Sequence, residues 1–90
     1  MREWRFWSYD VWGNAREGFE VNDRYEIDKV YIDETIIADD KKLATLVRKI
    51  FGLRKIQLSF DGDDHVIYIE ASRDGYPIGE MELVTEQAQE

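Results

Sequence analysis

Only one stretch of this chain carries a helical period, and that limits the folds it can adopt. Apolar residues recur there at the i, i+3, i+4, i+7 and i+8 spacing, in Leu43, Leu46, Val47, Ile50 and Phe51. This spacing predicts a helix with one continuous apolar face. Asp39 or Asp40 is a suitable N-cap, and Gly52 is a suitable residue to end the helix. A single helix with one apolar face needs a second layer to bury it, so the other segments must supply a sheet.

The remaining segments read as strands separated by turns. They are residues 2–11, 24–32, 55–60, 65–71 and 76–84. We therefore expect an α+β fold of order ββαβββ, with a mostly antiparallel sheet and one amphipathic helix on one face.

Three local details follow from the alternation of apolar and polar residues. The phase changes between Ile27 and Val30, which predicts a bulge or turn near residues 28–29. The 55–60 strand is expected to point Phe60 inward, together with its other apolar residues. Pro77 favours the entrance of a strand or an edge strand, because proline cannot donate a ladder hydrogen bond.

Length and composition indicate one small domain that folds by packing alone. We assign residues 1–85 to the domain and residues 86–90 to a flexible acidic tail, because 90 residues cannot support two cores. The chain has no cysteine, so disulfides and cysteine-based metal sites are excluded. No apolar run approaches the length of about 20 residues that spans a membrane, and no secretory leader is visible. A cytoplasmic protein without membrane contact is the expectation.

The chain is strongly acidic, and its charged residues are unevenly distributed along the sequence. The formal net charge is −8, which disfavours polyphosphate partners unless the basic residues are segregated. Six of the twelve basic residues fall between Lys41 and Lys55, and nine acidic residues fall between Glu17 and Asp40. Ordinary helix design accounts for most of the basic block, because cations favour the end of a helix.

Catalytic and metal-binding patterns are weak. Asp61, Asp63, Asp64 and His65 are metal-ligand types, but their spacing does not fit a calcium loop and a solvated hairpin turn explains them better. Glu80 and Glu82 share one strand face, where outward acids are typical guards of an edge strand. We expect no enzyme activity, no metal and no cofactor.

The most distinctive stretch is residues 9–21, in which two glycines and two large aromatic residues separate two strands. Trp12 lies in this stretch and is either folded onto the core or offered to a partner. The pattern of small residue, arginine, acid, glycine and aromatic residue in residues 15–21 recurs in residues 72–78, so Arg16 and Arg73 form a possible pair. A turn preference explains most of this repetition. The candidate partner-binding residues are Trp12, Arg16, Glu17, Phe19, Glu20, Asp23, Arg73 and Tyr76.

The leading functional hypothesis is a non-enzymatic module that binds another protein through an acidic and aromatic surface. One form of it is mimicry of DNA toward a basic protein groove, by the acids Glu17, Glu20, Asp23, Glu26, Asp28, Asp33, Glu34, Asp39 and Asp40. The alternative is a binder of single-stranded nucleic acid, although the net charge opposes it. Its candidate residues are Trp4, Trp7, Lys41, Arg48 and Lys49, with Arg2 and Arg5. The chain is expected to be a monomer, or a homodimer paired through an exposed edge at residues 76–84.

Residues 9–14, 18–23 and 73–80 resemble a group of short uncharacterised proteins from bacteriophages and mobile elements. The resemblance covers the two turn regions and the adjoining strand ends, and it transfers no catalytic residue. It implies a small accessory protein of phage origin, for which inhibition of a host enzyme or defence system is a plausible role. The partner would then be a host or phage factor.

Overall fold

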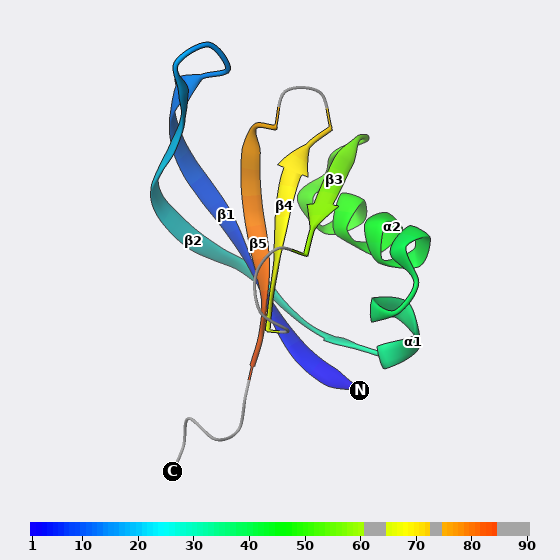
Figure 1. Cartoon of the computed structure of the whole chain (residues 1–90). Helices are drawn as coiled ribbons and strands as arrows, with labels where there is room; N and C mark the ends of the chain where they lie inside the picture. The colour runs from blue at the N-terminus through cyan, green and yellow to red at the C-terminus, as the bar shows by residue number, and fades with distance from the viewer. Residues whose placement is uncertain (61–64, 73–74, 85–90) are drawn as a thin grey trace.

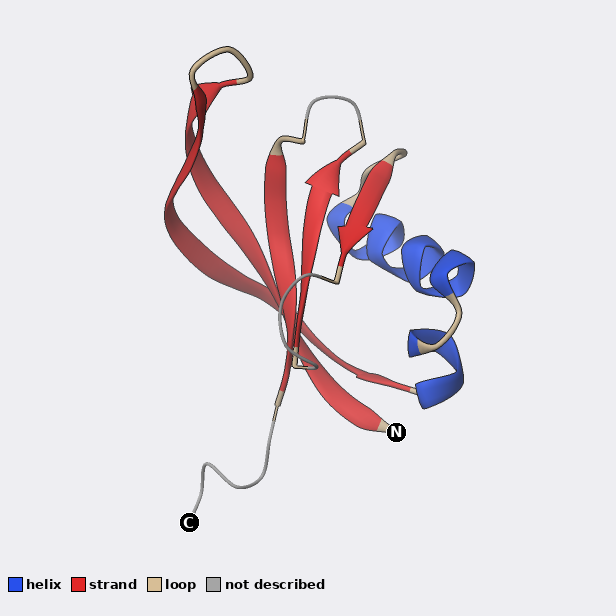
Figure 2. Cartoon of the chain, in the orientation of Figure 1, coloured by secondary structure: helices blue, strands red, loops and turns tan. Residues whose placement is uncertain are grey.

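Five antiparallel strands form one sheet, and two helices lie on one face of it (Figures 1 and 2). The computed structural model describes residues 1–60, 65–72 and 75–84. The elements are β1 (Arg2–Asn14), β2 (Gly18–Ile32), α1 (Glu34–Ile37), α2 (Asp40–Phe51), β3 (Ile56–Ser59), β4 (Val66–Ala71) and β5 (Pro77–Leu83). Their order across the sheet is β2-β1-β5-β4-β3. The antiparallel sheet is as predicted, but the described residues form two helices where one was expected.

The two helices begin in the same way, each at an aspartate. Asp33 accepts hydrogen bonds from the backbone N–H and the hydroxyl of Thr35, and Asp39 accepts from the N–H groups of Lys41 and Lys42. These bonds satisfy N–H groups that have no partner inside the helix. At the other end of α2, Gly52 adopts φ +68°, the left-handed conformation that glycine favours. The prediction of α2 and its caps is confirmed, whereas the short α1 was not expected.

The face of the sheet toward the helices, here called the covered face, holds the core. It buries apolar side chains from β1, the end of β2, α2, β4 and β5: Trp4, Phe6, Ile32, Leu43, Val47, Ile67, Ile69, Met81 and Leu83. The edge of the Phe51 ring packs against Phe6, with the ring centroids 6.3 Å apart. Gly79 makes this packing possible, because a Cβ there would overlap the Trp7 carbonyl oxygen and lie 3.1 Å from the Phe51 ring. The opposite side, the open face, carries no helix in the described part of the chain.

The β5 strand lies in the middle of the sheet, between β1 and β4. The expected homodimer edge at residues 76–84 is therefore wrong, because both sides of β5 are already paired. Pro77 begins the strand, as predicted. Glu80 and Glu82 consequently do not guard an edge, and their role is a different one. Phe60 is exposed, so its predicted inward position is also wrong.

The first hairpin is longer than predicted, and β2 contains two bulges. Its register with β1 shifts between Phe6 and Trp7 and again between Asp10 and Val11. The extra residues in β2 are Ile27 and Asn22. The first bulge lies next to the predicted site at residues 28–29, and the second was not anticipated.

Candidate functional site

The far half of the β1–β2 hairpin has little support from the rest of the sheet. Among the described residues, strand β5 pairs with β1 from Trp4 to Ser8, and beyond Ser8 each strand of the hairpin pairs only with the other. Figure 1 shows this part extending past the ends of the other strands. We call residues 9–14 and 18–24, with the turn between them, the distal hairpin.

The turn of the distal hairpin is built by its own residues. The side-chain oxygen of Asn14 accepts hydrogen bonds from the backbone N–H groups of Arg16 and Glu17, at 3.0 and 2.9 Å. Gly13 has φ +95°, and a Cβ there would overlap the carbonyl oxygen of Gly18. The turn therefore holds the side chains of Arg16 and Glu17 at the exposed end of the molecule.

Trp12 is 67% exposed on this hairpin and is surrounded by carboxylates. Its Cα partner on β2 is Glu20, and the preceding residue on the same strand side, Asp10, lies directly opposite Asp23. Like charges placed opposite each other in a sheet are destabilising. The described structure relieves Asp10 only through a bond from the exposed Asn22 amide, at 3.2 Å. The Asp10–Asp23 pair thus carries a cost in stability, and it lies on the same side of the hairpin as an exposed indole. Exposed aromatic side chains among charges are typical of a binding surface.

Phe19 and Tyr76 form an aromatic pair on the other side of the hairpin. Their ring centroids lie 5.0 Å apart in an edge-to-face arrangement. Phe19 is half-buried, so it holds the hairpin against the start of β5 instead of serving as a free anchor. Six of the predicted binding residues lie on the distal hairpin and Tyr76 contacts it, whereas Arg73 lies outside the described residues.

The open face carries a connected cluster that the sequence analysis missed. The Tyr9 hydroxyl donates to Glu80 Oε1 at 2.6 Å, and Arg24 Nη1 donates to Glu80 Oε2 at 2.7 Å. The Arg24 guanidinium carbon also lies 4.0 Å from the centroid of the Trp7 ring. Trp7 Nε1 in turn donates to Glu82 at 3.2 Å. Burial, and then the hydrogen bond and charge of Glu80, raise the pKa of Tyr9 above its ordinary value.

The outer edge of β2 is protected along part of its length. The Glu3 carbonyl accepts a hydrogen bond from the N–H of Val84, which follows β5. The backbone N–H and C=O groups of Glu3 therefore point toward β5 and away from β2, and so do those of every second residue of β1. By register, the backbone N–H groups of Arg24 and Lys29 then point outward from the sheet. The carboxylates of Asp23 and Asp28 accept these two N–H groups, each at 2.8 Å. Each cap directly follows a bulge, and both devices discourage pairing with another strand.

Several of the acids proposed for DNA mimicry have local roles. Asp33 and Asp39 cap helices, and the bonds from Thr35 lower the pKa of Asp33. Glu34 Oε1 lies 3.7 Å from Arg2 Nε, and Glu26 Oε1 lies 4.0 Å from Arg5 Nε, so each forms an ion pair. The acids around Trp12 are therefore the stronger candidates for recognition.

The residues proposed for nucleic-acid binding do not form one surface. Trp4 is only 5% exposed and belongs to the core, so it cannot stack on a base. Trp7 lies on the open face, whereas Lys41, Arg48 and Lys49 belong to α2, on the covered side. The sheet separates the two groups, so they do not share one surface.

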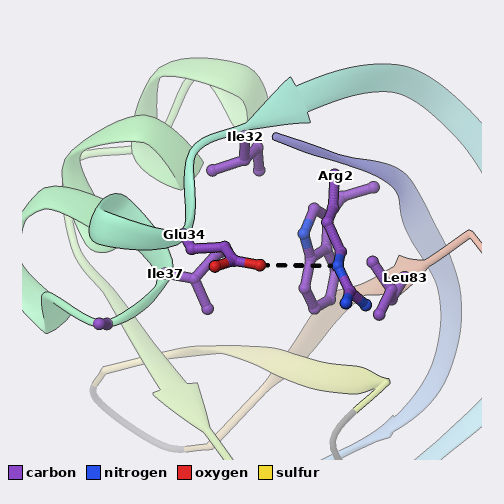
Figure 3. A pocket seen from close by; sticks show the side chains of 7 residues that line it. Arg2, Ile32, Glu34, Ile37 and Leu83 are labelled. Carbon is purple, nitrogen blue, oxygen red and sulfur yellow. Dashed lines mark ion pairs between the residues drawn. The ribbon is translucent and has the colours of Figure 1, made fainter.

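A small apolar pocket lies at the other end of the sheet, beside α1 (Figure 3). Its volume is about 210 Å³, and its lining includes Trp4, Ile32, Ile37, Ala38 and Leu83. Figure 3 shows the Arg2–Glu34 ion pair crossing in front of it. A cavity of this size accommodates one small apolar group.

In residues 1–60, 65–72 and 75–84, no three acidic or histidine side chains gather to hold a metal ion. Of the predicted metal-type residues, His65 is exposed and the three aspartates lie outside the described residues. Neither described helix is long and apolar enough to cross a membrane.

Comparison of the chain with protein families, with curated proteins and with solved structures found no match. The resemblance to phage proteins therefore stays a prediction.

Proposed function

We propose that this chain is a binding module that docks onto another protein through its distal hairpin and performs no chemistry of its own. The observation that carries the proposal is Trp12, a large exposed ring on a part of the sheet that little else supports. Exposed tryptophans in this setting are common anchors of protein interfaces.

The charge around the anchor indicates the kind of partner. Asp10, Glu20 and Asp23 lie on the same side of the hairpin as Trp12, and the whole chain has a net charge of −8. A basic groove or patch on the partner complements this surface and accelerates association. Inhibition of a nucleic-acid enzyme by presentation of acids to its groove is one form of this function.

The proposal is tested by affinity capture with the immobilised chain and two variants. Trp12→Ala should lose the captured partner while its circular dichroism spectrum shows that the chain is still folded at the temperature of the assay. Tyr31→Ala is the matched control, because Tyr31 is also exposed, at 64%, but lies at the other end of β2. Tyr31→Ala should retain the partner.

Salt separates the proposed mode of binding from simple apolar adhesion. Capture through the carboxylates should weaken steeply as ionic strength rises. Equal capture by both variants, or capture that does not respond to salt, would contradict the proposal. Retention on single-stranded DNA at moderate salt would instead support the nucleic-acid alternative.

A further inference from the structure

The guanidinium group of Arg24 occupies a site on the open face whose walls come from other strands. One wall is the ring of Trp7 on β1, and a second is the carboxylate of Glu80 on β5, 2.7 Å from Arg24 Nη1. A cation over an indole face and beside a carboxylate is a recognised mode of binding for arginine and lysine side chains. Arg24 is therefore an internal ligand of this site.

The walls are held in place without help from Arg24. Tyr9 donates to Glu80, and the Trp7 indole donates to Glu82, so both the carboxylate and the ring are fixed by bonds within β1 and β5. These strands lie side by side in the middle of the sheet. With Arg24 in place, Glu80 has only 12% of its side chain exposed, so it is a poorly hydrated anion that favours a cationic neighbour.

The occupant, in contrast, comes from β2, which in the described structure pairs with another strand on one side alone. Arg24 belongs to edge strand β2, lies two residues after the bulge at Asn22, and is 42% exposed at its side chain. Its removal from the site requires movement of one long side chain and leaves the core intact. Without Arg24, the cluster presents the carboxylates of Glu80 and Glu82 beside the aromatic rings of Trp7 and Tyr9.

Charges on the neighbouring strands do not fill the vacated position. Arg5 lies opposite Glu82 on β5, and its Nε is 4.0 Å from Glu26 on β2. Tyr68 of β4 lies opposite Glu80 and adds no positive charge. The site thus keeps an acidic and aromatic character once Arg24 leaves.

We propose that Trp7, Tyr9 and Glu80 form a recognition site for an arginine side chain of the partner protein, which displaces Arg24 on binding. This inference rests on the proposed function and specifies the chemistry of the partner: a segment with an exposed arginine. A planar guanidinium suits the site better than an ammonium, because it stacks on the indole and bonds the carboxylate at the same time.

The test needs no partner protein, and its probe is the small molecule N-acetyl-arginine amide. The readout is the indole N–H resonance of Trp7 in a nitrogen-15 correlation spectrum, assigned with a Trp7→Phe variant. The neutral isostere N-acetyl-citrulline amide is the control probe. Lys29→Ala is the control variant, because it removes the other cation on this face of β2.

We expect Arg24→Ala to show a saturable shift of the Trp7 indole resonance with the arginine probe and none with the citrulline probe. The unmodified chain and Lys29→Ala should need a higher probe concentration for the half-maximal shift, since Arg24 is a tethered competitor for the same site. Adding Glu80→Gln to Arg24→Ala should abolish the shift. If Arg24→Ala gives a spectrum without dispersed resonances and is therefore unfolded, Arg24→Gln takes its place, because glutamine keeps most of the side-chain stem.

Two results would overturn the inference. One is an indole shift of equal size with the arginine and citrulline probes, and the other is no shift in either folded Arg24 variant. Neither result affects capture through Trp12, so failure of this site and failure of the proposed function are distinguishable.

Discussion

Replacement of Tyr9 by phenylalanine removes one hydroxyl from the open-face cluster and leaves the ring in place. The lost bond is short, 2.6 Å, and its acceptor is a charged carboxylate. Hydrogen bonds to charged groups contribute about 1.5–3 kcal/mol, and partial exposure places this one at the lower end. We expect Tyr9→Phe to lower the free energy of unfolding by about 1.5 kcal/mol at neutral pH. The melting temperature should fall by roughly 6–12 °C.

The same bond predicts a pH dependence with a definite sign. Burial and Glu80 raise the pKa of Tyr9 above its ordinary value of 10.0. Below pH 10 the stabilisation is therefore complete. Above it the unfolded chain ionises this tyrosine while the folded chain does not, so the unmodified protein loses about 1.4 kcal/mol by about pH 11. At that pH the difference in the free energy of unfolding between the unmodified protein and Tyr9→Phe should approach zero.

Urea unfolding followed by circular dichroism, at neutral pH and at about pH 11, measures both effects. Tyr31→Phe is the control, since it removes an exposed hydroxyl from β2. Other alkaline titrations are common to the unmodified protein and Tyr9→Phe, so they cancel in the difference between these two proteins. A stability difference between Tyr9→Phe and the unmodified protein that is the same at both pH values would refute the reasoning.

Three other substitutions test the fold and its edge. Trp4→Ala should cost about 3–5 kcal/mol, and Trp12→Ala at most about 1.7 kcal/mol, because Trp12 buries only about a third of its roughly 200 Å². Equal losses in urea unfolding would contradict the assignment of core and surface. Gly79→Ala should cost about 3 kcal/mol, since its methyl group overlaps a β1 carbonyl, and an unchanged melting temperature would disprove that close approach. Asp23→Ala combined with Asp28→Ala uncaps two outward N–H groups and should promote self-association, measured by light scattering. The matching double asparagine variant keeps the acceptor oxygens, and association of that variant to the same extent would exclude the cap as the cause.

Helix α2 could be predicted from the sequence because it depends on interactions between residues that are close along the chain. The apolar stripe, the aspartate cap and Gly52 determined α2, because each acts within a few residues along the chain. Helix α1 has the same kind of aspartate cap, but its four residues are too few to show a period. A search for capping residues alone would have found it.

The position of β5 was not predictable from alternation. Pro77 and two outward glutamates suggested an edge, but strand order depends on pairing with β1, about 75 residues away. The open-face cluster was missed for the same reason. The sequence shows the types of its members, Trp7, Tyr9 and Glu80, but not that they lie close together. Their proximity depends on the register of β1 with β5.

Pairing of the first strand with the last also affects how the chain acquires its structure. The β1–β2 hairpin requires only neighbouring residues and can form early, whereas its Trp4 and Phe6 remain without their β5 partners until Leu83 and Met81 are available. Loop closure over that separation is slow compared with hairpin formation. During synthesis on a ribosome, the sheet therefore cannot close until nearly all of these residues have emerged, and an early hairpin exposes its apolar side for that interval.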